Sequence, residues 1–276
     1  MDREKLRAYR SLGINRLSIG VQSFHDDDLK FLTRIHSAAD AKRCVRDAFA
    51  AGFENVSIDL MFSLPLQPFE RWQANLSEAL ALGPAHLSCY SLIVEPDTPL
   101  FHMVQSKQIT PLDADRDAER YAYTSEFLTS GGFEQYEVSN YARPGFRCRH
   151  NLAYWSHTDY LGLGPSAHSF QSRSRWWNVR DLNVYEETLE KNEFPLGGGE
   201  HLDDPQLMEE AIFLGLRSTG IDLAGFRQRF GHDLPSEYAD LIGMLKNQGR
   251  VVLKGDILRL TGSGYLVCDE ICQAFR

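Results

Sequence analysis

Residues 148–155, CRHNLAYW, place several chemically capable side chains within eight positions. His150 and Tyr154 lie four positions apart, and so do Asn151 and Trp155. A helical turn would put the members of each pair on a shared face. Neutral imidazole is a ligand for iron and for zinc, so His150 is the residue here that could hold a metal.

The neighbours of His150 bear on which metal it would bind. Cys148, His157 and His168 are the nearest other candidate ligands, but their spacing is not that of a zinc site. An axial ligand to heme iron needs one histidine and a flat apolar wall. Several aromatic residues could supply this wall: Tyr154, Trp155, Tyr160, Trp176 and Trp177. The alternative, a structural histidine within a packed aromatic cluster, stays open.

A second group of polar residues lies on predicted strands. In RLSIGVQSF and NVSIDLMF, apolar residues alternate with Gln22, Ser57 and Asp59. A filled core would not contain these groups, because an unpaired buried carboxylate is costly. Near the carboxyl ends of parallel strands, they indicate a ligand cavity. The alternative is that Asp59 only bonds a neighbouring amide or arginine for structural reasons.

The positions of these candidate residues are set by an alternating series of predicted strands and helices. Strands are predicted at RLSIGVQSF, NVSIDLMF, HLSCYSLIV and QYEVSNYA. Helices are predicted at 3–12, 38–51, 68–82 and 112–130. This order is typical of parallel βα units whose right-handed crossovers place the helices on one side of the sheet.

The second half of the chain has a different sequence pattern. Residues 143–200 are rich in Gly, Arg, Ser and aromatic residues without clear periodicity. Helical patterns at 204–217, 221–230 and 235–247 then precede a hairpin, which is typical of a small winged-helix unit. We therefore expect three parts, residues 1–142, 143–200 and 201–276.

Composition excludes some classes of function. A net charge of −9 disfavours nucleic acid as a partner. No apolar run reaches the roughly 20 residues needed to cross a bilayer, and the charged start lacks a signal core, so a cytoplasmic location is expected. The five cysteines fit a reducing compartment. Cys268 and Cys272, four positions apart with apolar neighbours, are interpreted as core residues.

The order of several motifs resembles one family. NRLSIGVQSF, LTRIH, SIDLMFSLPLQ, HLSCYSL with EPDTPL, YEVSNYARPG, and CRHNLAYW with DYLGLGPSAHSF occur in that sequence. Together they resemble the HemW family of heme chaperones, a branch of the radical S-adenosylmethionine (SAM) superfamily related to oxygen-independent coproporphyrinogen III oxidase. The resemblance spans about residues 3–170, and the C-terminal unit fits the accessory domain of that family.

The resemblance implies roles for particular residues. Gln22, Arg34 and Asp59 match positions around bound SAM in the family, and Ile93 matches a backbone contact. The HNxxYW stretch, which comprises His150, Asn151, Tyr154 and Trp155, matches an element associated with heme binding. By this resemblance His150 is the candidate iron ligand, and heme and SAM are the expected cofactors.

The [4Fe-4S] cluster of the superfamily is held by a CxxxCxxC loop, and this spacing does not occur in the chain. The resemblance therefore implies an α/β fold that keeps the last three strands of a six-stranded partial barrel, followed by the winged-helix-like α+β domain. It also implies that the chain as given does not cleave SAM. The strand at 16–23 is expected to form an open edge that can pair with another chain.

Three functions are compatible with these features. The favoured one is a heme-binding chaperone that delivers heme to respiratory acceptor proteins, with homodimerisation and peripheral membrane contact left open. The alternative is an oxygen-independent coproporphyrinogen III oxidase, against which the missing cysteines and HNLAYW argue. A nucleic-acid module on the C-terminal unit is the third, and the acidic residues before its basic ones disfavour it.

Overall fold

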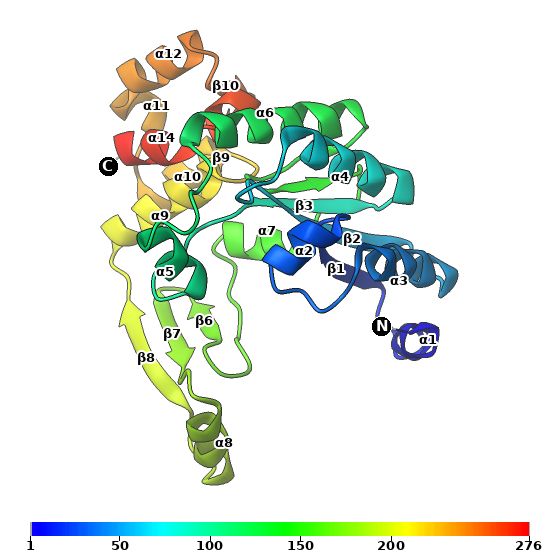
Figure 1. Ribbon diagram of the computed structural model, residues 1–276. Helices are drawn as coiled ribbons and strands as arrows, with labels where there is room; N and C mark the ends of the chain where they lie inside the picture. The colour runs from blue at the N-terminus through cyan, green and yellow to red at the C-terminus, as the bar shows by residue number, and fades with distance from the viewer. Residues whose placement is uncertain (1, 276) are drawn as a thin grey trace. The chain divides into compact units, whose positions relative to one another are not determined.

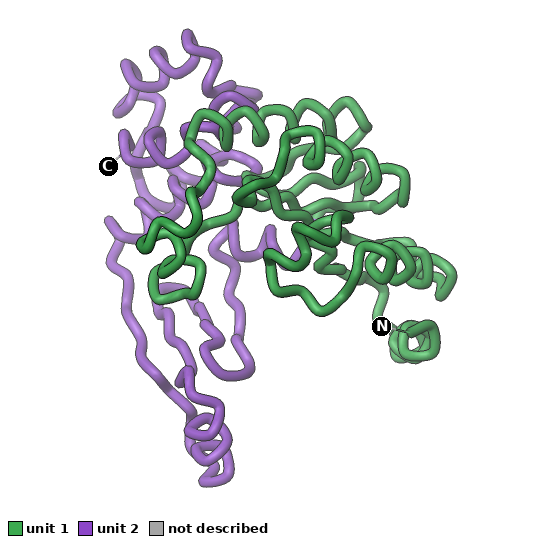
Figure 2. The backbone as a smooth tube through the Cα atoms, in the orientation of Figure 1, with its two compact units in different colours: residues 1–147 green, residues 148–276 purple. Residues whose placement is uncertain are grey.

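The computed structural model describes residues 2–275. The chain divides into two compact units, residues 1–147 and residues 148–276 (Figure 2). The boundary between them falls directly before the helix that carries His150. The division into three parts, with boundaries at 142/143 and 200/201, stays a prediction.

The first unit is built on one sheet. Its parallel strands are β1 (Arg16–Gln22), β2 (Asn55–Phe62) and β3 (His86–Ser91), and the strand order is β1-β2-β3-β5-β4. The pairing places Gly20 opposite Asp59, and Asp59 opposite Ser88. The predicted parallel βα units are therefore confirmed for these three strands.

The fourth predicted strand, QYEVSNYA, is corrected by the structure. It forms two short strands, β4 (Glu134–Gln135) and β5 (Asn140–Ala142), and β5 runs antiparallel to β3. The chain reverses within this segment, where Glu137 and Asn140 are buried. This reversal ends the parallel series and places polar residues beside β3.

Helices cover one face of this sheet (Figure 1). The unit contains α1 (Arg3–Ser11), α2 (Asp26–Phe31), α3 (Ala38–Ala50), α4 (Phe69–Leu82), α5 (Pro99–Gln105) and α6 (Ala114–Ser130). Helix α3 begins with a capping box between Ser37 and Asp40, which satisfies amides at the helix start. Helix α6 is capped by Asp113, whose side chain accepts from the Arg116 amide, so the helix begins two residues later than predicted.

The core lies between the sheet and these helices. Val56, Ile58 and Leu60 of β2 are fully buried against side chains of α3, α4 and α6. Burial of each such side chain contributes about 1.5–3 kcal/mol to folding. The predicted division of β2 into an apolar helix-facing side and a polar opposite side is therefore confirmed.

Strand β1 lies at one end of the sheet, as the sequence predicted for an open edge. Leu17 and Ile19 are only partly buried there, unlike their neighbours on β2. A hollow of about 280 Å³ runs along this edge and is bounded by residues such as Leu6 and Ala41. The edge therefore offers unpaired backbone groups beside an apolar surface.

The second unit begins with α7 (Arg149–Trp155) and an antiparallel sheet. Its strands are β6 (His168–Gln171), β7 (Ser174–Asn178) and β8 (Leu196–His201), and α8 (Leu182–Glu190) lies between the last two in the chain. These three strands were not among the predicted ones. Its strands are short and contain Trp, Arg and Gly, so the usual alternation of apolar and polar residues is missing.

The remaining chain forms a small α+β unit. Its elements are α9 (Asp204–Leu216), β9 (Ile221–Asp222), α10 (Leu223–Phe230), α11 (Leu234–Glu237), α12 (Ala239–Asn247), β10 (Val251–Lys254), β11 (Ile257–Leu260), α13 (Gly262–Tyr265) and α14 (Cys268–Ala274). The predicted hairpin forms between β10 and β11, and β9 adds a third strand. Among residues 2–275, no helix is both long and apolar enough to span a membrane.

Candidate functional site

The polar face of the first sheet carries Asp59 at its centre. The Ser18 hydroxyl donates a hydrogen bond of 2.9 Å to Oδ1 of Asp59. Asp59 is only half-buried, so its carboxylate remains within reach of solvent. The structural role considered from the sequence and a binding role are both compatible with this single bond.

Gln22 reaches the same region through an unusual backbone conformation. The β1–β2 register shifts between Gly20 and Gln22, and Gln22 has a φ of 66°. Its Nε2 lies 2.8 Å from the position that a Cβ on Gly20 would occupy. The amide of Gln22 therefore folds back over Gly20, whose partner on β2 is Asp59. The structure brings Gln22 and Asp59 to adjacent positions.

Arg34 and Ile93, the other two residues matched to the SAM site, are both exposed. Arg34 is exposed on the segment between α2 and α3. Ile93 is 70% exposed and follows the end of β3, where the Leu92 amide still bonds the Phe62 carbonyl. Within residues 2–275, no hydrogen bond or ion pair joins either side chain to Gln22 or Asp59. The assignment of these four residues to SAM stays a prediction.

Sequence reasoning missed an acidic residue beside the sheet. Glu137 is 1% exposed, and burial raises its pKa to about 7. The Ser139 amide donates to its Oε1 at 3.2 Å, and hydrogen bonds from Asn140 also act to lower the pKa. Asn140 in turn accepts a 2.5 Å hydrogen bond from Ser88 of β3. The polar residues within YEVSN were the only sequence signal for this buried carboxyl group.

A buried histidine occupies the opposite end of the same strands. His86 bonds Ser57 Oγ through Nδ1 and the Tyr136 hydroxyl through Nε2, both at 2.7 Å. Burial lowers its pKa to about 3, so the ring stays neutral. All three residues are nearly inaccessible to solvent. Ser57, expected to line a cavity, is therefore held in a structural network.

The predicted helical turn in the second unit is confirmed. On α7 the rings of His150 and Tyr154 meet edge to face, with centroids 4.7 Å apart and an interplanar angle of 88°. His150 is exposed and Trp155 is half-buried. Asn151 accepts a weak hydrogen bond from the Cys148 thiol at 3.4 Å. The imidazole therefore stands on an aromatic support and is open to a ligand.

The aromatic support continues beyond Tyr154. The Tyr154 and Tyr160 rings lie 4.4 Å apart, and Tyr160 stacks with Phe170 at 6.3 Å. Phe170 also stacks with His157 at 5.4 Å. Tyr160 is thus part of an aromatic wall, as predicted. Trp177 instead contacts His168, with centroids 5.5 Å apart.

A cluster of charged residues packs against these aromatic rings. Arg175 pairs with Glu210 and Glu200, each at 2.7 Å, and His157 bonds Glu210 at 3.1 Å. Burial acts to raise the pKa of Glu210, but hydrogen bonds from Arg175 and His157 outweigh it and lower the pKa. Burial chiefly lowers the pKa of His157. Arg175 therefore serves the internal structure of this unit.

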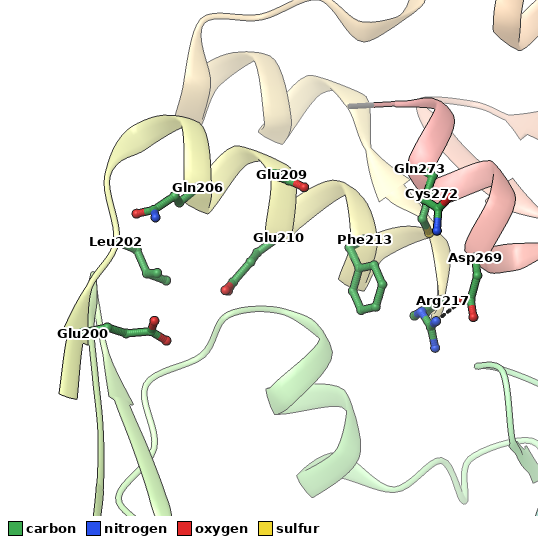
Figure 3. Close-up of a pocket in the computed structure, with 10 residues that line it drawn as sticks. All are labelled: Glu200, Leu202, Gln206, Glu209, Glu210, Phe213, Arg217, Asp269, Cys272 and Gln273. Carbon is green, nitrogen blue, oxygen red and sulfur yellow. Dashed lines mark hydrogen bonds and ion pairs between the residues drawn. The ribbon is translucent and has the colours of Figure 1, made fainter. Parts of the chain in front are cut away.

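Glu200 and Glu210 also line a pocket of about 520 Å³ (Figure 3). Across it, Arg217 pairs with Asp269, and Cys272 lies nearby on α14. Four of its ten lining residues are acidic and one is an arginine, which disfavours a ligand that carries carboxylates. This pocket is therefore a poor match for the propionate groups of a porphyrin.

The cysteines do not form a cluster site. Cys268 and Cys272 lie 3.9 Å apart and are buried, as expected for core residues. Cys89 and Cys148 are buried elsewhere, and Cys44 is half-buried. Among residues 2–275, no group of three or more ligand-type side chains could hold a metal. The cysteines of this chain therefore do not fit a [4Fe-4S] cluster.

Comparison with known proteins agrees with the architecture. Residues 1–77 match the radical SAM superfamily, and residues 202–267 match the HemN C-terminal domain. The structure superposes on coproporphyrinogen III oxidase (HemN) from Escherichia coli, a radical SAM enzyme, with a TM-score of 0.80. This likeness covers 100% of the chain and 67% of that protein at 22% identity, and so concerns the fold.

Curated relatives are closer in sequence. The heme chaperone HemW of Bacillus subtilis is 34% identical over 99% of this chain and 72% of its own length. HemW of Synechocystis is 39% identical over 79% of this chain and 53% of its own length. The chain thus spans between about half and three quarters of these relatives. The chain belongs to the HemW family of heme chaperones within the radical SAM superfamily.

Proposed function

We propose that this protein binds heme through α7 and passes it to acceptor proteins. The observation that carries the proposal is the exposed His150 ring, which Tyr154 holds edge-on at 4.7 Å. The names of the relatives, heme chaperones, point the same way. A neutral imidazole nitrogen is an axial ligand for heme iron, and aromatic rings beside it provide an apolar contact for the macrocycle.

Exposure of the ligand suits transfer. A heme enclosed in a deep pocket would dissociate slowly, whereas a ligand on an exposed helix leaves one side of the heme open to an incoming acceptor. The series from Tyr154 through Tyr160 to Phe170 limits the motion of the helix surface without covering His150. Asn151 and Trp155 are half-buried and would define the edge of the site.

The acceptors in this proposal are heme proteins of respiration, and the compartment is the cytoplasm. The free thiols of all five cysteines are consistent with reducing conditions. The open edge of β1 supports pairing of two copies, since among residues 2–275 this strand pairs only with β2. Peripheral contact with a membrane would bring the protein to membrane-bound acceptors.

The first unit is proposed to retain part of a SAM site. Gln22 and Asp59 together offer an amide and a carboxylate, which suit the hydroxyl and amino groups of SAM. Arg34 and the Ile93 backbone would contribute from neighbouring segments. The cluster that would supply electrons for SAM cleavage does not fit the cysteines of this chain. Binding of SAM without its cleavage is the expected behaviour.

Heme titration of the full chain tests the proposal. The wild-type protein should shift the Soret band of added heme, and His150→Ala should not. His102→Ala is a matched control, because His102 is also exposed on a helix and meets an aromatic edge, that of Phe101. This control should behave as wild type. Identical spectra for wild type and His150→Ala would remove His150 from the site.

A further inference from the structure

A second flat surface lies on the antiparallel sheet of residues 148–276. The register pairs His168 with Trp177, and Trp177 with Gly198, so these three positions form a row across β6, β7 and β8. Register partners in antiparallel strands point to the same face of a sheet. The His168 and Trp177 rings are inclined by only 32°, with centroids 5.5 Å apart. The row therefore places two tilted aromatic rings in contact on one face of the sheet.

Gly198 explains why the indole can lie flat. A Cβ at this position would come within 2.6 Å of Trp177 Cζ2 and 2.8 Å of Cε2. A side chain there would lift the ring away from the strand. With glycine, the indole packs over the β8 backbone while Trp177 remains half-buried and lines a cavity. The row is thus a wall rather than a packed core contact.

This wall borders a cavity that also contains a cation. The cavity has a volume of about 550 Å³, and its lining includes His168, Trp177 and Arg180. Arg173 and Arg175 are engaged with carboxylates of Asp204, Glu200 and Glu210. Arg180 is exposed and takes part in no salt bridge among residues 2–275. Its guanidinium is therefore available for an anionic ligand.

The wall continues the aromatic surface beneath His150. Phe170 and Arg175 form the next row of the same sheet face, two residues along each strand. Rows at this spacing are about 7 Å apart. Phe170 stacks with Tyr160, which contacts Tyr154. Phe170 is 2% exposed, so a flat ligand on this face would meet the His168 and Trp177 rings, and the buried Phe170 supports the sheet beside them.

We propose that the His168–Trp177–Gly198 row binds the macrocycle of a carboxylate-bearing tetrapyrrole, with Arg180 binding a carboxylate. The choice of a tetrapyrrole among flat anions rests on the function proposed above. The wall contacts the ring system and not the iron, so it should also bind an iron-free porphyrin. This property separates the wall from His150, which acts only on iron.

The test uses iron-free protoporphyrin IX and the full chain, with binding followed by porphyrin fluorescence. Trp177→Ala should weaken binding about tenfold, and Trp177→Phe should keep most of it. Trp176→Ala is the matched control, because Trp176 neighbours Trp177 but pairs with Gly199 on the opposite face. It should bind as wild type.

The carboxylate contact is tested separately. Arg180→Gln should weaken protoporphyrin IX about fivefold and leave its dimethyl ester unchanged. If Trp177→Ala does not fold, the affinities of Arg180→Gln for protoporphyrin IX and for its dimethyl ester still test the proposed site. Wild-type affinity in both Trp177→Ala and Arg180→Gln would overturn the proposal, and so would equal losses in Trp177→Ala and Trp176→Ala. Failure of heme ligation by His150 would leave these iron-free results intact.

Discussion

The buried carboxyl of Glu137 makes the stability of the first unit depend on pH. Burial raises its pKa from the ordinary 4.5 to about 7 in the folded state. Between these values the folded state therefore binds more protons than the unfolded state, and the free energy of unfolding decreases as pH rises. The loss begins above pH 4.5 and is complete above about pH 7, at about 3 kcal/mol.

Glu137→Gln removes this ionisation while keeping an oxygen that can accept from the Ser139 amide. We expect the variant to exceed wild type in stability by about 3 kcal/mol at pH 8. The advantage should shrink to near zero at pH 4.5. Glu126→Gln removes an exposed acid on α6 and should change stability by less than about 0.5 kcal/mol.

Hydrogen exchange measured in peptides of β2 and β3 gives the opening free energy of the first unit without a contribution from residues 148–276. The carboxyl carbon shift of Glu137, followed by NMR between pH 4 and 9, gives its pKa directly. A Glu137→Gln variant with the same pH slope as wild type would refute the reasoning. A carboxyl that titrates near pH 4 would do so as well.

Three further outcomes are expected. Gly20→Ala should weaken SAM binding at least about tenfold, because the new Cβ would lie 2.8 Å from Gln22 Nε2. Calorimetry measures this affinity, and an unchanged value would contradict the proposed SAM site. Glu210→Gln should lower the stability of residues 148–276 by about 1–2 kcal/mol in hydrogen-exchange measurements, since Arg175 and His157 lose a shared charged partner. An unchanged stability would show that this group of charged residues is dispensable. Anaerobic reconstitution with iron, sulfide, dithionite and SAM should yield no 5′-deoxyadenosine above a protein-free control, and a clear yield would disprove the cluster argument.

The local pattern of the first unit was enough to predict its parallel strands. In β2 every second residue is apolar and buried, so the helix-facing side could be identified from periodicity. The direction of β5 could not, because a strand of three residues has the same pattern in either direction. Gln22 was expected on the polar face, but its φ of 66° and fold over Gly20 depend on the register shift with β2.

The second unit was harder to predict because its key contacts join distant residues. His157 and Glu210 are 53 positions apart, and neither carries a local signal that would pair them. Trp176 and Trp177 are neighbours in the chain, yet their side chains belong to opposite faces of the sheet. Only strand register distinguishes the one on the wall from the one behind it. The helical spacing of His150 and Tyr154 was local, and that contact was predicted.

The candidate residues separate by unit, and this bears on how the chain could work without a cluster. Gln22 and Asp59 belong to residues 1–147, whereas His150, His168 and Trp177 belong to residues 148–276. Every contact that supports His150, from Tyr154 to the Arg175–Glu210 pair, is made within the second unit. Loss of thiolate ligands to a cluster would therefore leave the proposed heme surface with all its supports. We therefore expect the proposed heme binding by residues 148–276 not to depend on SAM binding by residues 1–147.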